Sequence, residues 1–175
     1  MPILRNFHGS DWFACRTRAR AEKKVDFHLG RHGIQTYLPL LKQEHQWADR
    51  RKRIDIPLFP GYLFVFTSLE GIGEVLRTPG VVKLADPNGY PTPVRENELE
   101  SVRRFVDGVN ETGVLPSPAD YLAIGEEVVV IEGPFKGMTG VLIENRGRAR
   151  VAVRIAALRQ ATSVELDRAI LRPAR

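Results

Sequence analysis

Hydrophobic residues recur along the chain in two patterns. Helical spacing, with apolar positions roughly every three to four residues, predicts helices in three segments: residues 18–31, 69–77 and 96–107. Short apolar or β-branched runs predict strands between them: residues 12–15, 34–41, 55–66, 81–84 and 91–94. The last two runs flank a turn sequence at 86–89 and predict a hairpin. Glycine or proline at Gly30, Pro79 and Gly108 is expected to end each helix.

The pattern changes beyond residue 108. Residues 108–120 contain glycines and prolines without periodicity, which is typical of a linker. Regularly spaced β-branched runs follow and predict a small all-β barrel: residues 128–131, 140–143, 151–155 and 161–166. The sequence therefore predicts an α+β protein. Its expected parts are an N-terminal α/β sandwich with an antiparallel sheet (1–108), a flexible linker (109–121) and a C-terminal β-barrel (122–175).

One segment, "DIPLFPGYLFVF" at residues 55–66, combines strand composition with Pro57 and the pair Pro60-Gly61. Proline cannot donate to a strand ladder. We therefore expect a bend, at which an incoming hairpin arm turns into a central strand. Alternation beyond the bend places Leu63 and Val65 on one face of that strand.

Charge narrows the classes of partner. The formal net charge is +5 and the sequence pI is about 9.7. Residues 1–108 hold 17 Lys and Arg against 13 Asp and Glu, whereas the remainder holds 9 against 8. The basic excess thus lies in the first domain, and it suits a polyanion or an acidic protein surface.

The first basic cluster lies where the first helix is expected to start. Its five cations fall within nine residues and are Arg16, Arg18, Arg20, Lys23 and Lys24. Cations oppose the positive end of a helix dipole, so the cluster is a costly helix start. A solvated helix start and a surface for an acidic partner or nucleic-acid phosphate are both open interpretations.

The second basic cluster lies in a polar segment, residues 43–53, which predicts an exposed hairpin or loop. Its cations follow Trp47 and are Arg50, Arg51, Lys52 and Arg53. Four cations at one tip repel each other unless a polyanion is near, and a tryptophan offers a stacking face to a base. We interpret the tip as a binding element; the alternative is a solvated loop with Trp47 folded back on the strands.

A third candidate is the stretch "GEEVVVIEGPFKGMTGVLIE", residues 125–144. It predicts two barrel strands joined by a tight loop, in which Gly and Pro fix the turn. The loop residues are Gly133, Pro134, Phe135, Lys136 and Gly137. Phe135 is expected to be exposed at the tip, which suggests a partner contact; insertion into the core is the alternative.

The sequence shows no arrangement typical of an enzyme. His28 and His32 are four residues apart, but no carboxylate or cysteine cluster completes a metal site. Cys15, the single cysteine, lies in an apolar run and is expected to be a buried hydrophobe. Neither a signal-peptide pattern nor an apolar run of about 18 residues is present. We expect a cytoplasmic non-enzyme with no metal, cofactor or membrane contact.

These motifs together resemble a known family. The stretch at 125–144 resembles a KOW motif, and "WFACRTRARAEKKV" with "PLFPGYLFV" resembles the N-terminal (NGN) domain of NusG-type transcription elongation and antitermination factors. The resemblance implies an NGN domain and an SH3-like KOW barrel. "TYLPL", "QWADRRKRIDIPLFPGYLFV" and "LRTPGVV" resemble the specialised paralogues of the RfaH and UpxY type more than the housekeeping factor.

The resemblance also implies three sets of site residues. Those matching the docking surface for the RNA polymerase clamp helices and its rim are Trp12, Arg16, Arg18, Arg20, Lys23, Phe59, Pro60, Tyr62 and Phe64. Those matching the hairpin that approaches the gate loop and upstream or non-template DNA are Trp47, Arg50, Arg51, Lys52 and Arg53. Phe135, within Gly133–Gly137, matches a KOW loop position that contacts a small-subunit ribosomal protein.

The function implied is that of a monomeric transcription elongation or antitermination factor. It binds RNA polymerase through the N-terminal domain and suppresses pausing or termination, while the KOW domain recruits the ribosome, a termination factor or other partners. Termination-promoting activity is left open. Some paralogues refold the KOW domain as a helical hairpin, but only residues 154–161 tolerate helix here, so we expect the barrel. The alternative function is that of a translation-associated RNA-binding KOW protein.

Overall fold

The structure is a computed structural model that describes residues 9–174, and contacts divide the chain into two compact units. The first unit runs to Pro39 and includes Pro57–Val94; the second is formed by Leu40–Ile56 and the chain from Arg95 onward. This division differs from the predicted boundary because the third helix and the hairpin group with the C-terminal strands. The family-domain boundaries at 108 and 122 stay a prediction.

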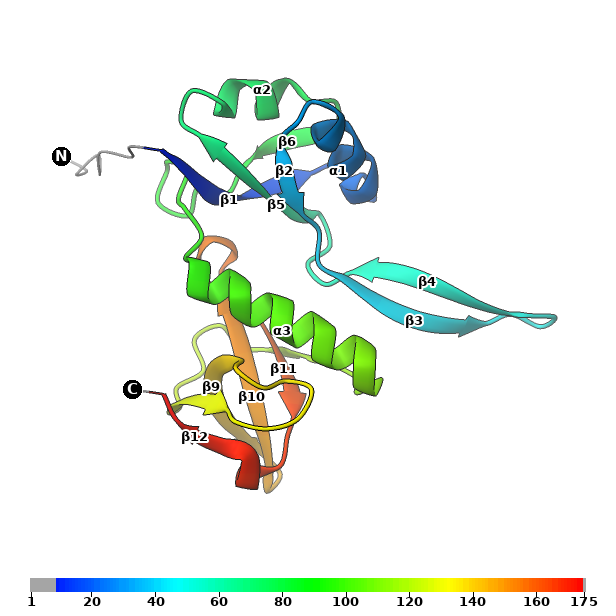
Figure 1. Ribbon diagram of the computed structural model, residues 1–175, viewed down its shortest axis with the longest axis vertical. Helices are drawn as coiled ribbons and strands as arrows, with labels where there is room; N and C mark the ends of the chain where they lie inside the picture. The colour runs from blue at the N-terminus through cyan, green and yellow to red at the C-terminus, as the bar shows by residue number, and fades with distance from the viewer. Residues whose placement is uncertain (1–8, 175) are drawn as a thin grey trace. The chain divides into compact units, whose positions relative to one another are not determined.

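The first unit is a four-stranded antiparallel sheet with two helices on one face (Figure 1). Its strand order is β2-β5-β1-β6. The strands are β1 (Ser10–Thr17), β2 (Gln35–Tyr37), β5 (Tyr62–Ser68) and β6 (Val81–Leu84), and the helices are α1 (Glu22–Arg31) and α2 (Ile72–Arg77). The predicted helices and central strands of this part are thus confirmed, although both helices start later than predicted and β1 is longer than predicted. The single strand predicted at 34–41 is divided between β2 and the start of β3.

Alternation divides the two central strands between the two faces of the sheet. Phe13 and Cys15 of β1, with Leu63 and Val65 of β5, point to the side of the helices, and they pack with Val25, Leu29 and Val75. All seven side chains are at most 2% exposed. The expectation that Leu63 and Val65 share a face is confirmed.

The predicted bend at Pro60-Gly61 is confirmed. β4 (Arg51–Pro57) pairs only with β3 (Leu40–Gln46), whereas β5 starts at Tyr62 in the middle of the other sheet. Gly61 adopts φ +83°, which glycine tolerates without steric cost. Its N–H donates to the buried carboxylate of Glu22 at 2.6 Å, and its carbonyl accepts from Thr17 N at 2.8 Å.

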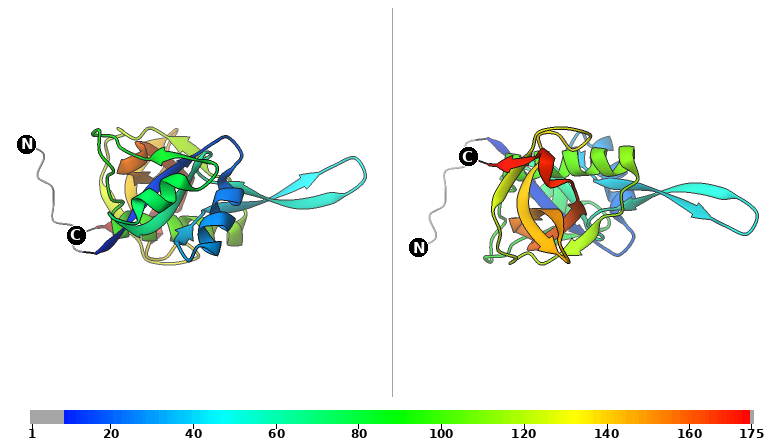
Figure 2. Two further views of the ribbon diagram at one scale, coloured as in Figure 1. Left: turned by 90° about the horizontal axis from the view of Figure 1, so that it is seen from above. Right: turned by 90° about the horizontal axis from the view of Figure 1, so that it is seen from below.

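The β3–β4 hairpin is a two-stranded sheet by itself (Figure 2). Trp47 N donates to Arg50 O at 2.8 Å, so only Ala48 and Asp49 form the turn. At its base, the amide of Asn110 accepts from Lys42 N and donates to Leu40 O. The predicted exposed hairpin is therefore confirmed, and α3 (Glu96–Thr112) is its support.

The C-terminal part of the second unit is a six-stranded antiparallel sheet with strand order β12-β8-β9-β10-β11-β7. The strands are β7 (Ser117–Ala119), β8 (Glu127–Val130), β9 (Thr139–Asn145), β10 (Arg148–Ile155), β11 (Gln160–Glu165) and β12 (Leu171–Pro173). Short 3-10 turns, Ala156–Leu158 and Arg168–Ile170, precede β11 and β12. The expected strands of the barrel region are confirmed, and residues 154–161 hold the end of β10, a 3-10 turn and the start of β11, with no α-helix.

Three expectations about local structure are wrong. The third helix does not end at Gly108 but continues to Thr112, with Gly113 in the left-handed region at φ +70°. The expected linker consequently contains the last turn of α3 and also β7, which pairs with β11. The predicted strand at 91–94 is reduced to a single bridge between Pro93 and Phe13.

Candidate functional site

The second face of the first unit's sheet gathers the aromatic residues that were predicted for docking. Trp12 and Phe64 alternate to this face, opposite the side of the helices. Phe59, in the bend, meets Phe64 edge to face with ring centroids 6.3 Å apart. Tyr62 lies two residues before Phe64 on the same strand, so it shares the face. The structure therefore brings four predicted residues together in one cluster.

Two residues of this cluster were missed by the sequence reasoning. Tyr37 of β2 stacks on Phe64 at 6.2 Å, and Phe66 lies 5.3 Å from Trp12. The alternation of β5 already pointed to Phe66, which follows Phe64 by two positions. Tyr37 could be found only from the pairing of β2 with β5, which places it opposite Phe64.

Exposure divides the aromatic cluster into two layers. Trp12, Phe59 and Phe64 are 6%, 2% and 0% exposed. Tyr62 and Phe66 are half-buried, and Pro60 at the bend is exposed. The buried rings therefore support the half-buried ones, and contact with a partner falls first to the latter.

The first basic cluster is divided: Lys23 and Lys24 lie in the first turn of α1, whereas its three arginines precede the helix, contrary to expectation. Arg16 belongs to β1, where it lies beside Tyr62 on one side and Lys83 on the other. Arg18 and Arg20 lie in the turn that follows, and helix α1 begins only at the acidic Glu22. This order places a carboxylate, and not the three arginines, at the positive end of the helix dipole.

Only part of this basic cluster lies on the sheet face that carries the aromatic cluster. Arg16 shares the face with Trp12 because both have even positions on β1. Lys23 is exposed on α1, which covers the opposite face of the sheet. Arg18 and Arg20 are exposed at the end of β1. The structure thus separates Lys23 from the residues that were predicted beside it.

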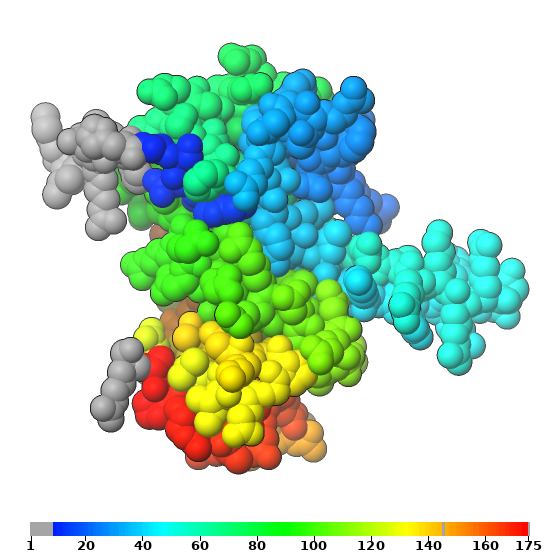
Figure 3. Space-filling model, in the orientation of Figure 1, coloured from blue at the N-terminus to red at the C-terminus, as the bar shows by residue number. Residues whose placement is uncertain are grey.

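The hairpin tip is exposed as predicted. Trp47 is 55% exposed, and Figure 3 shows the outer part of the hairpin projecting into solvent. The Trp47 and His45 rings are inclined at 66° in an edge contact, with centroids 5.2 Å apart. All four cations of the tip, Arg50 to Arg53, are exposed. Trp47 thus contacts β3 at His45 without being buried, and this exposure does not decide between a binding element and a solvated loop with Trp47 folded back on the strands.

The barrel loop differs from its prediction at the central residue. Phe135 is 2% exposed, and its ring lies 6.4 Å from that of Phe105 on α3. A Cβ on Gly108 would lie 2.4 Å from the Phe135 ring, so the missing side chain of this glycine makes room for it. Gly133, Pro134, Lys136 and Gly137 are exposed. The expectation of an exposed aromatic tip is wrong because α3 offers a complementary hollow.

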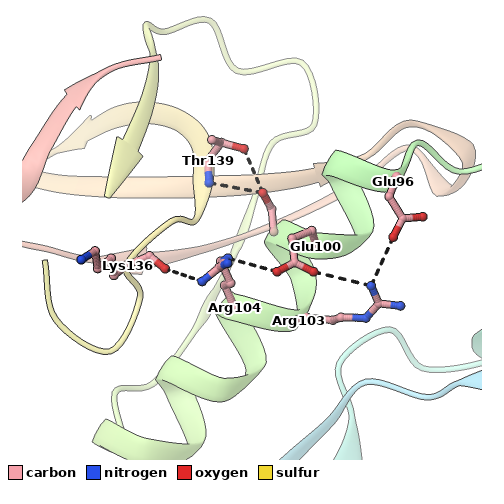
Figure 4. A network of polar contacts seen from close by, with 7 residues as sticks. Glu96, Glu100, Arg103, Arg104, Lys136 and Thr139 are labelled. Carbon is pink, nitrogen blue, oxygen red and sulfur yellow. Dashed lines mark hydrogen bonds and ion pairs between the residues drawn. The ribbon is translucent and has the colours of Figure 1, made fainter. Parts of the chain in front are cut away.

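Polar contacts hold the same loop against α3 (Figure 4). Arg104 donates to the carbonyl of Lys136 at 2.8 Å and pairs with Glu100 at 3.1 Å. The Ser101 hydroxyl lies 2.9 Å from that of Thr139 and also accepts from Thr139 N at 3.2 Å. The chain that follows Phe135 is therefore held to α3 at two backbone groups, Lys136 O and Thr139 N.

A cleft of about 310 Å³ lies between α3 and strands β9 and β10. Two of its charged lining groups have partners within the unit: Glu98 accepts from Ala156 N at 3.2 Å, and Arg154 donates to the carbonyls of Tyr121 and Ala123. The other two charged lining residues are Arg95 and Glu127.

Groups that could carry chemistry are few in the described chain. Burial raises the pKa of the Cys15 thiol to about 12, which keeps it protonated and weakly nucleophilic at neutral pH. Within residues 9–174, no three His, Cys, Asp or Glu side chains gather as a metal site. Over the same residues, no helix is long and apolar enough to cross a bilayer. The candidate sites are surfaces of a protein whose fold class is α+β.

Comparison with known proteins gives the family. Residues 10–103 match the family model described as "Transcription termination factor nusG". Because this match covers more than half of the chain, the chain belongs to the NusG family. The predicted family and fold class are confirmed.

Individual relatives agree with this assignment. The chain is 28% identical over 177 residues to the transcription termination/antitermination protein NusG of Thermus thermophilus, covering 90% of this chain and 95% of the relative. It is 30% identical over 122 residues to the protein of the same name from Pseudomonas aeruginosa, covering 67% of each. A solved structure, described as domain interaction in Thermotoga maritima NusG, has a TM-score of 0.51 at 22% identity and covers 95% of this chain and 98% of that one. This last likeness supports the fold.

Proposed function

We propose that this protein acts in transcription elongation and antitermination and that it binds RNA polymerase through the second face of its first sheet. The relatives that match nearly the whole chain are named for transcription termination and antitermination. The observation that carries the docking proposal is the aromatic cluster around Phe64, with half-buried Tyr62 and Phe66 at its surface and Arg16 on the same face. Tyrosine and arginine are typical anchors of protein interfaces.

The occupant that fits this face is a helical element with apolar and acidic residues, such as the clamp helices of the polymerase. Rings in a supported cluster lose little entropy on binding, while Arg16 supplies charge complementarity. Binding the closed clamp more tightly than the open clamp would shift the population toward the closed state. Fewer pauses and less termination are the expected result. The specialised-paralogue type remains a prediction from sequence.

The proposal also includes the contacts predicted for the hairpin tip and the barrel loop. The contact of the barrel loop is changed, because Phe135 is buried. We assign Trp47 and Arg50–Arg53 to the gate loop or to DNA near the polymerase, supported by the exposure of the tip. A ribosomal or termination partner would meet the exposed loop residues Gly133, Pro134 and Lys136. Phe135 would join that contact only after leaving α3.

A pull-down of purified RNA polymerase with the full-length tagged chain tests the docking face. Tyr62→Ala combined with Arg16→Glu should weaken capture at least tenfold, because both side chains reach the surface while the buried rings stay in place. Leu76→Ala is the control, since Leu76 is 45% exposed on α2, which covers the opposite face. Unchanged capture by the double variant, with circular dichroism showing a folded chain, would reject this docking face.

A further inference from the structure

The bend at Pro60-Gly61 is a β-turn whose type can be derived from its geometry. Tyr62 N donates to Phe59 O at 3.0 Å, which closes a four-residue turn with Pro60 and Gly61 at its centre. Proline fixes the first central φ at about −65°, and the second, at Gly61, is +83°. A negative φ followed by a positive φ is typical of a type II turn, whereas both are negative in type I. The bend is therefore a type II turn, and it leads directly into β5.

Turns of types I and II differ in the direction of one peptide group, the one between the two central residues. Their dihedral angles are related by a rotation of this peptide through roughly 180°, and here the peptide joins Pro60 to Gly61. Neither its N–H nor its carbonyl takes part in the bond that closes the turn. The groups that surround this peptide therefore decide which of the two types is more stable.

Glu22, the first residue of α1, contacts the N–H of this peptide. Its carboxylate accepts from Gly61 N at 2.6 Å, and Glu22 is only 6% exposed. The following peptide is held as well, because Thr17 N donates to Gly61 O at 2.8 Å. In a type I turn the Pro60 carbonyl would replace the N–H and would turn its negative end to a buried carboxylate. Glu22 thus stabilises type II by a charge-assisted hydrogen bond and destabilises type I by repulsion.

The type of the turn determines which group the bend presents on its other side. The Pro60–Gly61 peptide is trans, so its N–H and its carbonyl point in opposite directions. The Pro60 carbonyl therefore points away from Glu22. Pro60 is exposed, and among the contacts of residues 9–174 its carbonyl accepts no hydrogen bond. The type II turn consequently offers an acceptor two residues before Tyr62, where a type I turn would offer a donor.

We propose that Glu22 is a positioning residue of the docking face, and that it holds the bend in the form whose Pro60 carbonyl accepts a hydrogen bond from the docked partner. Backbone N–H groups within a helix are already bonded, so the donor on a helical partner is a side-chain N–H. Glu22 itself is buried and does not touch the partner. This inference rests on the proposed function and adds a polar contact to the aromatic and cationic ones.

Amide hydrogen exchange, followed by NMR on the full-length chain, measures the state of the turn directly. The Gly61 N–H should exchange at least tenfold faster in Glu22→Ala and less than threefold faster in Glu22→Gln, because the glutamine oxygen still accepts. Asp26→Ala is the matched control, since it removes another α1 carboxylate that bonds to a strand, at Thr36 Oγ1. It should leave the exchange of Gly61 unchanged. Equal exchange in wild type and Glu22→Ala, or a uniform rise across β5, would overturn the proposal.

Capture of purified RNA polymerase by the full-length tagged chain connects the turn with docking. Glu22→Ala should weaken capture about tenfold, whereas Glu22→Gln and Asp26→Ala should weaken it less than threefold. Full capture by Glu22→Ala would overturn the proposal. Circular dichroism checks that each variant is folded.

Substitutions at Gly61 change the same turn from the other side of the hydrogen bond. A Cβ at this position would meet nothing within 4 Å, so Gly61→Ala and Gly61→Asn differ mainly in their tolerance of a positive φ. Alanine should weaken capture about tenfold and asparagine less than threefold. Equal losses in the two variants would contradict a role of the turn type.

The double variant shows whether Glu22 acts through the turn. Once Gly61→Ala has changed the turn, adding Glu22→Ala should weaken capture by less than a further twofold; losses that multiply would overturn the proposal. If Glu22→Ala keeps full capture while Tyr62→Ala with Arg16→Glu loses it, this proposal falls and the docking face stands. If wild type captures no polymerase, the proposed function falls and the docking role of Glu22 falls with it.

Discussion

The hairpin tip and the barrel loop look alike in sequence and differ in structure. Each places one aromatic residue, Trp47 or Phe135, beside cations in a turn between two strands. Trp47 is 55% exposed, whereas Phe135 is 2% exposed. The difference lies in the neighbouring element. Phe135 meets a helix with a ring at Phe105 and a gap at Gly108, while the described contacts of the Trp47 ring reach only His45, within its own hairpin.

The comparison teaches that the position of an aromatic residue in a loop does not decide its exposure. Burial of a phenylalanine contributes roughly 1.5–3 kcal/mol wherever a hollow of the right shape is available. The hollow on α3 exists because Gly108 has no side chain at this point of the helix surface. The ring that fills the hollow, Phe135, follows Gly108 by 27 residues in the chain. The two loops can therefore be distinguished by substitutions on either side of this contact.

The largest expected effect comes from Phe135→Ala. Removing a fully buried ring leaves a cavity and should lower the free energy of unfolding by about 3–5 kcal/mol. Chemical denaturation followed by circular dichroism measures the change. A loss below about 1 kcal/mol would mean that the ring leaves α3 in solution and that the two loops are alike after all.

Gly108→Ala should have the next largest effect on the free energy of unfolding. Its Cβ would lie 2.4 Å from the Phe135 ring, and such overpacking costs about 1–3 kcal/mol, against a gain of up to about 1 kcal/mol in helix propensity. Gly30→Ala, in α1, is the matched control because its Cβ would meet nothing within 4 Å. We expect a lower free energy of unfolding for the first variant and a higher one for the second; a gain in both would show that Gly108 has free space.

Ser101→Ala removes the polar contact beside the ring. Its hydroxyl accepts from Thr139 N, and loss of this acceptor should lower the free energy of unfolding by about 1–2 kcal/mol. Thr92→Ala is the control, since that hydroxyl bonds only locally to Tyr90 O at an exposed site. Equal and negligible changes in the same denaturation experiment would show that water replaces the Ser101 contact.

The smallest effect is expected at the hairpin. Trp47→Ala should change the free energy of unfolding by less than about 0.5 kcal/mol, because the side chain lies in solvent. Acrylamide should quench Trp47 in a Trp12→Phe chain and leave Trp12, which is 6% exposed, shielded in a Trp47→Phe chain. Shielding of Trp47 would indicate a contact that the structure lacks, and it would remove the contrast with Phe135.

Sequence patterns predicted those features that depend on neighbouring residues. Alternation identified the faces of β5, and Pro60-Gly61 located the bend, because both signals act through local backbone geometry. The polar, highly charged composition of residues 43–53 likewise predicted an exposed element around Trp47.

Features that depend on distant segments were not predictable in this way. Gly108 was interpreted as a helix end because a glycine near the end of a periodic segment usually has that role. Its actual role requires Phe135, which follows far along the chain. Tyr37 became part of the docking cluster only through strand pairing, and the short strand β7 exists only because β11 is beside it.

The two arms of the β3–β4 hairpin are equal in length, and this has a consequence for how the hairpin tolerates insertions and deletions. Along each arm, eight residues separate the tip bond, from Trp47 N to Arg50 O, from the base bond, from Leu58 N to Pro39 O. Lengthening both arms by one residue would turn Trp47 and Arg50 to the opposite side relative to the base held by Asn110. Lengthening both by two would restore their direction and extend the reach by about 6.6 Å. The length of the hairpin and the direction of its tip side chains can thus change independently. Adding two residues to each arm lengthens the hairpin and keeps the direction of Trp47 and Arg50. Natural length variants of this hairpin should therefore differ by even numbers of residues in each arm wherever the tip still has its target.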